Sequence, residues 1–254
     1  MPDEQSTTNK FKNIMDYARA MHHRYYRAFS AFHAYETLRE AIAINTVGKL
    51  RAEENAKIIG DFRGFFFPAQ EALRIYFFIE LAKMFDSSQQ ALHINKILNF
   101  AESNLKDLTA EAFTEYNQDQ SRVFIEELAT NYRGIAYSDL VMLRDKINKH
   151  KNTINNLKTY RDKWLAHDDI NKPEVPPITG EEIRDLFDIL ETILNFITGE
   201  LNSESWTYSQ AKDDAKHHTT LVIDYLRRFE PYRRREIENE LNEEMKKYKT
   251  KESI

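Results

Sequence analysis

Cysteine is absent from this 254-residue chain, and glycine and proline occur only 6 times each. Without cysteine the chain can form no disulfide, no thiolate metal site and no cysteine nucleophile, which suits a reducing compartment. Glycine and proline interrupt helices, so their scarcity, beside 41% apolar and 30% charged residues, predicts helices nearly throughout. The composition therefore predicts an all-α fold with a buried core.

Long uncharged apolar runs are also absent. The most apolar window, residues 65–85, carries Glu71, Arg74, Glu80 and Lys83, which predicts a buried helix rather than a membrane span. The N-terminal stretch MPDEQSTTNK has no apolar segment, so we expect no signal peptide and a cytoplasmic location. A net charge of −5 disfavours a strong global attraction to nucleic acid, but it permits a local basic patch.

The common cofactor and metal motifs are missing as well. The chain has no glycine-rich phosphate loop, no dinucleotide-binding turn and no HExxH. A di-iron bundle would need two Glu-x-x-His motifs on separate helices, and none is present. We therefore expect neither a cofactor nor a metal.

Apolar periodicity predicts helices joined by short connections. The predicted helices cover about 10–45, a short segment ending near 59, 68–85, a segment through 92–100, 109–116, 120–132, 138–166, a segment after Thr179 that includes Ile197, 210–229, and a terminal helix to about 249. They indicate an all-α helical bundle in which N-terminal helices (1–60) pack on a central bundle (61–203). Residues 204–254 are expected to form a C-terminal helical extension. The short connections predict that all three parts belong to one structural unit.

The helix after Thr179 has the most regular pattern. Thr179 and Glu182 have the spacing of a capping box, in which each side chain accepts from the other residue's backbone N–H. The apolar positions that follow recur every three or four residues: Ile183, Leu186, Phe187, Leu190, Ile193, Leu194 and Ile197.

The predicted helix 138–166 carries an apolar stripe that leads to a charged residue. Leu143, Ile147, Ile154 and Leu157 lie on one face, and the same face continues to Arg161. An unpaired buried guanidinium costs several kcal/mol, so Arg161 must find an anion or another acceptor. His167 follows six residues later, near the predicted helix end, where loss of regular geometry would let it swing toward Arg161.

The stretch Tyr160–Asp169, YRDKWLAHDD, resembles the signature of the HEPN superfamily: an arginine, a polar residue after it, and a histidine four to six positions after the arginine. The text RDKWLAHDD is similar to the abortive-infection branch, and LAKMFDSS followed by ALHINKIL resembles the earlier helix pair of that branch. The likeness covers roughly residues 65–200. A neighbouring antitoxin-linked branch has a tyrosine two positions after the histidine; here Asp169 stands there, so modification at such a tyrosine is not expected.

The resemblance implies a metal-independent endoribonuclease of an antiphage (abortive infection) or toxin-antitoxin system. It further implies a homodimer that acts on RNA, with an antitoxin or another defence protein as partner. In that setting Arg161, Asp162 and His167 are the candidate catalytic residues, and Lys163 is a candidate for holding RNA backbone. Arg227 and Arg228, from the strongest basic cluster, are further candidates for substrate binding.

Two alternatives stay open. Arg161 can instead pair with a carboxylate such as Asp86 or Asp168 and lock two helices, which would suit a non-catalytic HEPN-like module that binds a partner or senses nucleic acid. The basic clusters at 22–27 and 227–235 can serve an RNA-binding helical protein, although solvated helix faces also explain them.

Overall fold

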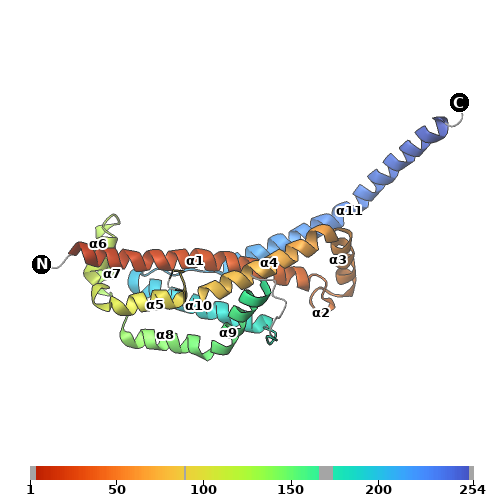
Figure 1. The fold of residues 1–254 in the computed structure, drawn as a ribbon. Coiled ribbons are helices and arrows are strands. Elements are labelled where there is room, and N and C mark those ends of the chain that lie inside the picture. Colours follow the sequence, from red (N-terminus) through yellow and green to blue (C-terminus); the bar gives the residue numbers. More distant parts are fainter. Residues whose placement is uncertain (1–3, 89, 166–173, 252–254) are drawn as a thin grey trace. The chain divides into compact units, whose positions relative to one another are not determined.

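The computed structural model describes residues 4–88, 90–165 and 174–251, and within these ranges it contains helices and no strand (Figure 1). The prediction of an all-α fold is therefore confirmed. The described residues divide into two compact units, which the following paragraphs treat separately. The predicted division into 1–60, 61–203 and 204–254 stays a prediction.

The first unit comprises the described residues of Met1–Phe29 and Ile75–Ala211. It holds the first part of α1 (Glu4–Glu40) and the end of α4 (Arg63–Met84), followed by the remaining helices up to residue 202. These are α5 (Ile94–Ser103), a 3-10 turn (Leu105–Asp107), α6 (Ala110–Tyr116), α7 (Arg122–Thr130), α8 (Tyr137–Lys149), α9 (Lys151–Tyr160), a π-helical turn (Arg161–Leu165) and α10 (Gly180–Asn202).

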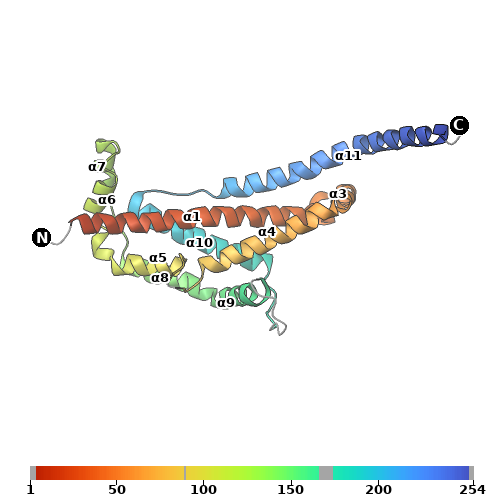
Figure 2. The ribbon, with the colours of Figure 1, turned by 45° about the horizontal axis from the view of Figure 1, so that its top comes forward.

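The core of this unit lies where α1 and α10 run side by side, as Figures 1 and 2 both show. Tyr25 and Phe29 of α1 pack against Phe187 of α10, with ring centroids 5.4 Å and 5.2 Å apart. Every apolar position named above for the helix after Thr179 is buried. The predicted capping box is present: Thr179 N donates to Glu182 Oε2 at 2.8 Å, and Glu182 N donates to Thr179 Oγ1 at 3.2 Å.

The second unit comprises Ser30–Arg74 and the described residues of Lys212–Ile254. It contains the end of α1, α2 (Ile44–Val47), α3 (Lys49–Asp61), the beginning of α4, and most of α11 (Ser209–Lys251). Its small core joins Ala41, Phe66 and Ile223, with Leu38, Ile59, Phe62 and Leu226 packed around them.

Two helix boundaries differ from the prediction because Pro68 does not begin a helix and Pro231 does not interrupt one. The helix predicted from Pro68 begins at Arg63, and α11 continues through Pro231. The ring of a proline inside a helix clashes with the carbonyl four residues before it and removes one N–H donor, but a long helix retains its other hydrogen bonds. No described helix is long and apolar enough to cross a membrane.

The predicted helix 138–166 is also wrong in part. It is interrupted at His150, whose φ of −106° and ψ of 17° end α8, and α9 then ends at Tyr160 in a π-helical turn. Ile147 and Ile154, on either side of the interruption, are both buried, so the apolar stripe itself is retained.

Candidate functional site

Arg161 lies at the junction between α9 and the π-helical turn Arg161–Leu165. In such a turn the backbone hydrogen bonds span five residues instead of four, which widens the helix, and such turns are frequent at functional sites. The Arg161 side chain is only 16% exposed, as the apolar stripe of α9 predicts. The helix thus presents one guanidinium at its partly buried end.

Two carboxylates hold this guanidinium. Arg161 Nη1 donates to Asp86 Oδ2 at 2.9 Å, and Arg161 Nε donates to Asp162 Oδ1 at 2.6 Å. The Asp162 hydrogen bond raises the pKa of Arg161, so the side chain stays charged. Burial raises the pKa of Asp86, but the Ser87 N–H and Arg161 together outweigh it and hold that pKa below its usual value. Arg161 and Asp86 are therefore both ionised at neutral pH.

The contact between Asp86 and Arg161 joins two segments that are 75 residues apart in the sequence. Asp86 follows the end of α4, where the text reads FDSS, and its own carboxylate accepts from Ser87 N at 2.7 Å. An aspartate carboxylate that accepts a hydrogen bond from the backbone N–H of the next residue stabilises the turn in which it lies. The turn after α4 is thereby shaped to receive the guanidinium from α9.

Aromatic rings continue the site beyond Arg161. Trp164 stacks on Tyr160 with ring centroids 6.0 Å apart and an interplanar angle of 13°, and Tyr160 in turn contacts Phe78 of α4 at 5.3 Å. Trp164 follows Arg161 by three residues, so continuing the apolar stripe at helical spacing would place its ring on the same face, but the side chain is 42% exposed. The π-helical turn rotates the residues after Arg161 relative to a regular helix, which the sequence pattern cannot reveal.

A profile of the HEPN AbiU2 family matches residues 6–220 of the chain. The chain belongs to the HEPN AbiU2 family. The match confirms the resemblance to the abortive-infection branch of the HEPN superfamily, and it covers both segments that meet at Asp86 and Arg161. No curated protein and no solved structure matches the chain.

For this HEPN AbiU2 protein, the candidate catalytic residues are described in part. Asp162 is exposed and accepts from Arg161, and Lys163 is exposed beside it. His167 lies outside the described residues, so the geometry of the Arg161–His167 pair is not part of the site described here. The catalytic roles of all three candidates, and the RNA contact of Lys163, stay predictions.

The arginines predicted to bind substrate lie in the second unit. Arg227 is only 16% exposed and is engaged by two carboxylates, Glu54 at 2.8 Å and Asp224 at 3.3 Å. Arg228 is exposed on the same helix. A guanidinium already paired twice must exchange these partners before it can bind a phosphate, whereas an exposed one need not.

The aromatic-basic cluster at 22–27 is divided between the core and the surface. His22 and Tyr25 are fully buried, and His22 stacks on Trp206 with ring centroids 4.4 Å apart. Arg24 pairs with Glu80 at 3.2 Å. The alternative of an RNA-binding surface therefore retains His23, Tyr26 and Arg27 as exposed side chains at this cluster. Among the described residues, no group of three or more acidic or histidine side chains is arranged to hold a metal ion.

Proposed function

We propose that this HEPN AbiU2 protein is a metal-independent endoribonuclease in which Arg161 and His167 act on RNA at a homodimer cleft. The observation that carries the proposal is the ion pair of 2.9 Å between Arg161 and Asp86. It brings together the two stretches, FDSS and RDKW, on which the resemblance to the abortive-infection branch rests.

The chemistry requires one proton acceptor, one proton donor and positive charge. The 2′-oxygen of the ribose forms a bond to phosphorus and loses its proton to a base, while the bond to the 5′-oxygen breaks and that oxygen takes up a proton from an acid. An imidazole with a pKa near ~6.5 can serve in either role at neutral pH. Arg161 stabilises the charge on the pentavalent phosphate, which is commonly the largest contribution to such catalysis.

The two carboxylates bind different nitrogens of the Arg161 fork. Asp162 takes Nε and Asp86 takes Nη1, so Nη2 takes part in neither hydrogen bond. Fixing the guanidinium in advance lowers the cost of orienting it when the phosphate binds. The exposed ring of Trp164 supports the proposal further, because base stacking on an aromatic side chain is a general mode of single-stranded RNA binding.

A homodimer supplies the second imidazole. One chain offers one histidine in the motif, so an acid and a base that are both imidazoles require a second copy. A twofold axis beside the 161–167 segment would bring two Arg161–His167 pairs to one cleft. The membership in an abortive-infection family supports a role in antiphage defence, with an antitoxin or another defence protein as partner.

A second function is favoured by the same ion pair. A guanidinium that bridges Asp86 and Asp162 across two segments is also what a purely structural clasp looks like. In that case the protein is a non-catalytic module that binds a partner protein or senses nucleic acid. The two functions differ in what they require of His167.

The test is RNA cleavage by the purified full chain with EDTA present. Wild-type protein is expected to cleave single-stranded RNA, and His167→Ala is expected to abolish cleavage. His150→Ala is the matched control, because His150 ends α8 eleven residues before Arg161 and has no role in the proposed chemistry. Cleavage that persists in His167→Ala would contradict the role given to His167, and a wild-type protein that cleaves no RNA would support the non-catalytic module.

A further inference from the structure

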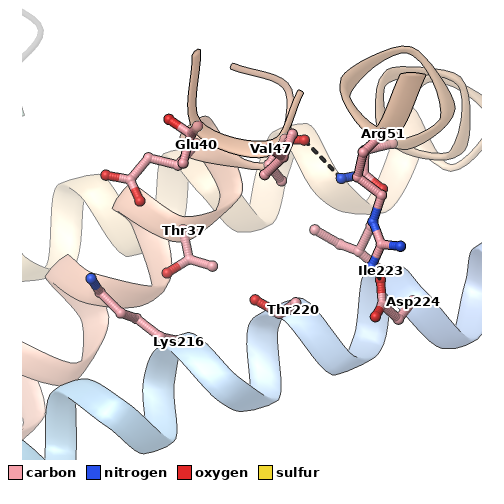
Figure 3. A pocket seen from close by; sticks show the side chains of 11 residues that line it. Thr37, Glu40, Val47, Arg51, Lys216, Thr220, Ile223 and Asp224 are labelled. Carbon is pink, nitrogen blue, oxygen red and sulfur yellow. Dashed lines mark hydrogen bonds and ion pairs between the residues drawn. The ribbon is translucent and has the colours of Figure 1, made fainter. Parts of the chain in front are cut away.

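The second unit contains a pocket of about 480 Å³ that no step of the proposed RNA chemistry uses. It lies between the end of α1, the helices α2 and α3, and α11, as Figure 3 shows. Its volume falls within the range of sites for small molecules, about 300–1,000 Å³. One wall of the pocket presents hydrogen-bond acceptors and the facing wall presents donors. This division determines which class of ligand the pocket can bind.

The wall formed by α1 and α3 presents acceptors. The Thr37 hydroxyl donates its hydrogen to His33 O at 2.7 Å, so toward the pocket Thr37 Oγ1 can only accept. Asn55 donates Nδ2–H to Ala41 O at 2.7 Å, and among the described residues its Oδ1 has no hydrogen-bond partner. Asn55 is only 4% exposed and its Oδ1 is closed to solvent, so this unsatisfied acceptor lies behind the pocket wall and not at its surface.

Glu40 adds a negative charge to these two acceptors. It lies on α1 three residues after Thr37, and Figure 3 shows both side chains on the same side of the pocket. A primary ammonium group carries three N–H donors and one positive charge. It therefore matches one carboxylate and one hydroxyl oxygen better than a neutral donor does.

The facing wall, formed by α11, presents donors. Lys216 and Thr220 lie one helical turn apart on α11 and both line the pocket. Figure 3 draws no ion pair between Lys216 and Glu40, although the two side chains lie at the same end of the pocket. Arg51 is instead committed to Asp224 at 2.7 Å. Lys216 and Thr220 together suit a carboxylate that lies close to the ammonium of the same ligand.

The remaining wall is apolar, because Ala41, Val47 and Ile223 line it. We propose that the pocket binds a free aliphatic α-amino acid. Its ammonium lies against Glu40 and Thr37, its carboxylate binds Lys216 and Thr220, and its side chain packs on the apolar wall. An α-amino acid is the class in which ammonium and carboxylate share one carbon, as the positions of Glu40 and Lys216 at one end of the pocket require.

The first test is isothermal titration calorimetry of the full chain with L-leucine, L-isoleucine, L-valine and L-methionine. At least one of them is expected to bind with one saturable site. Its analogues that lack the amine or the carboxylate, such as 4-methylpentanoate and 3-methylbutylamine for leucine, are expected to bind at least tenfold more weakly. No binding by any of the four amino acids, or equal binding by the analogues, would overturn the proposal.

The second test uses variants of each wall. Glu40→Gln and Lys216→Met are expected to weaken binding of the best amino acid at least tenfold, because each removes one of the two charges that face the ligand. Lys212→Met is the control, since Lys212 is exposed on α11 and does not line the pocket. Unchanged binding in both pocket variants would overturn the proposal. Heat is measured directly, so the result is independent of whether the protein cleaves RNA.

Discussion

Arg161 is the residue on which the proposed chemistry depends, and Asp86 fixes its position from another segment. Asp86→Asn weakens this contact but leaves a hydrogen-bond acceptor. We expect the rate of RNA cleavage to fall by about tenfold or more, because a misoriented catalytic group loses much of its effect. The free energy of unfolding should fall by only about 1 kcal/mol, since the pair is partly exposed.

The control for this prediction is Glu102→Gln, which alters the ion pair of 2.6 Å between Arg144 and Glu102 in the same unit. Chemical denaturation and single-turnover cleavage are measured for both variants. The control should lose a similar amount of stability and keep its cleavage rate. Equal cleavage rates in the two variants would contradict the role given to Asp86.

His22 provides a separate prediction about pH. Burial, with a smaller contribution from His23, lowers the pKa of His22 to about 3. The unfolded chain protonates this histidine near pH ~6.5. Between these two pH values the unfolded state binds more protons than the folded state. The contribution of His22 to the free energy of unfolding is therefore fully present above about pH 6.5. It is lost as the pH falls, by up to about 1.4 kcal/mol per pH unit.

His22→Phe should remove this contribution while retaining a ring beside Trp206. Urea denaturation at pH 7.5 and pH 5.0 tests it. Between pH 7.5 and pH 5.0 the free energy of unfolding of the wild-type protein should fall by about 2 kcal/mol more than that of the variant. The reason is that pH 5.0 lies about 1.5 units below the pKa of His22 in the unfolded chain. A loss of the same size in both proteins would show that His22 does not titrate in this way.

At the scale of a helix, the capping box of α10 gives a prediction for Thr179. Thr179→Ala removes the acceptor for Glu182 N, so the free energy of unfolding should fall by about 1 kcal/mol. Thr192→Ala is the comparison, because the Thr192 hydroxyl donates to Asp188 O within the same helix and caps nothing. Thermal unfolding of both variants measures the difference. A Thr192 variant that loses as much stability as the Thr179 variant would argue against the capping contribution.

The helices differ in how far the sequence could predict them. The apolar pattern of α10 and its capping residues lie within the helix itself, and both were predicted correctly. The interruption at His150 was missed, although the asparagines around it, at 148, 152, 155 and 156, have low helix propensity. The N-cap of α5 is His93, whose ring accepts from Lys96 N at 3.1 Å, and histidine is not among the residues usually preferred at this position.

At the scale of the whole molecule, the sequence predicted that Arg161 needs an anion and named Asp86 as one choice. It could not predict the exposure of Trp164, which depends on the π-helical turn. The pocket of the second unit was also missed. Thr37 and Lys216 are 179 positions apart, and only folding brings their complementary groups to one cavity.

The dimer is a prediction at this scale as well. If two Arg161–His167 pairs form one cleft, cleavage activity should follow the fraction of dimer. Sedimentation velocity across a dilution series gives that fraction, and cleavage rates per chain are measured at the same concentrations. Rates per chain should fall as dimers dissociate. A monomer with the full rate per chain would contradict the shared cleft.

The most direct test of the ribonuclease proposal is the chemistry of the RNA ends produced with EDTA present. Attack by the 2′-oxygen predicts products with a 2′,3′-cyclic phosphate and a 5′-hydroxyl, and no cleavage where the ribose is replaced by 2′-deoxyribose. His167→Ala and Arg161→Ala should yield neither product. Cleavage at 2′-deoxy positions, products with a 5′-phosphate, or the same products from both variants would contradict the assignment of Arg161 and His167.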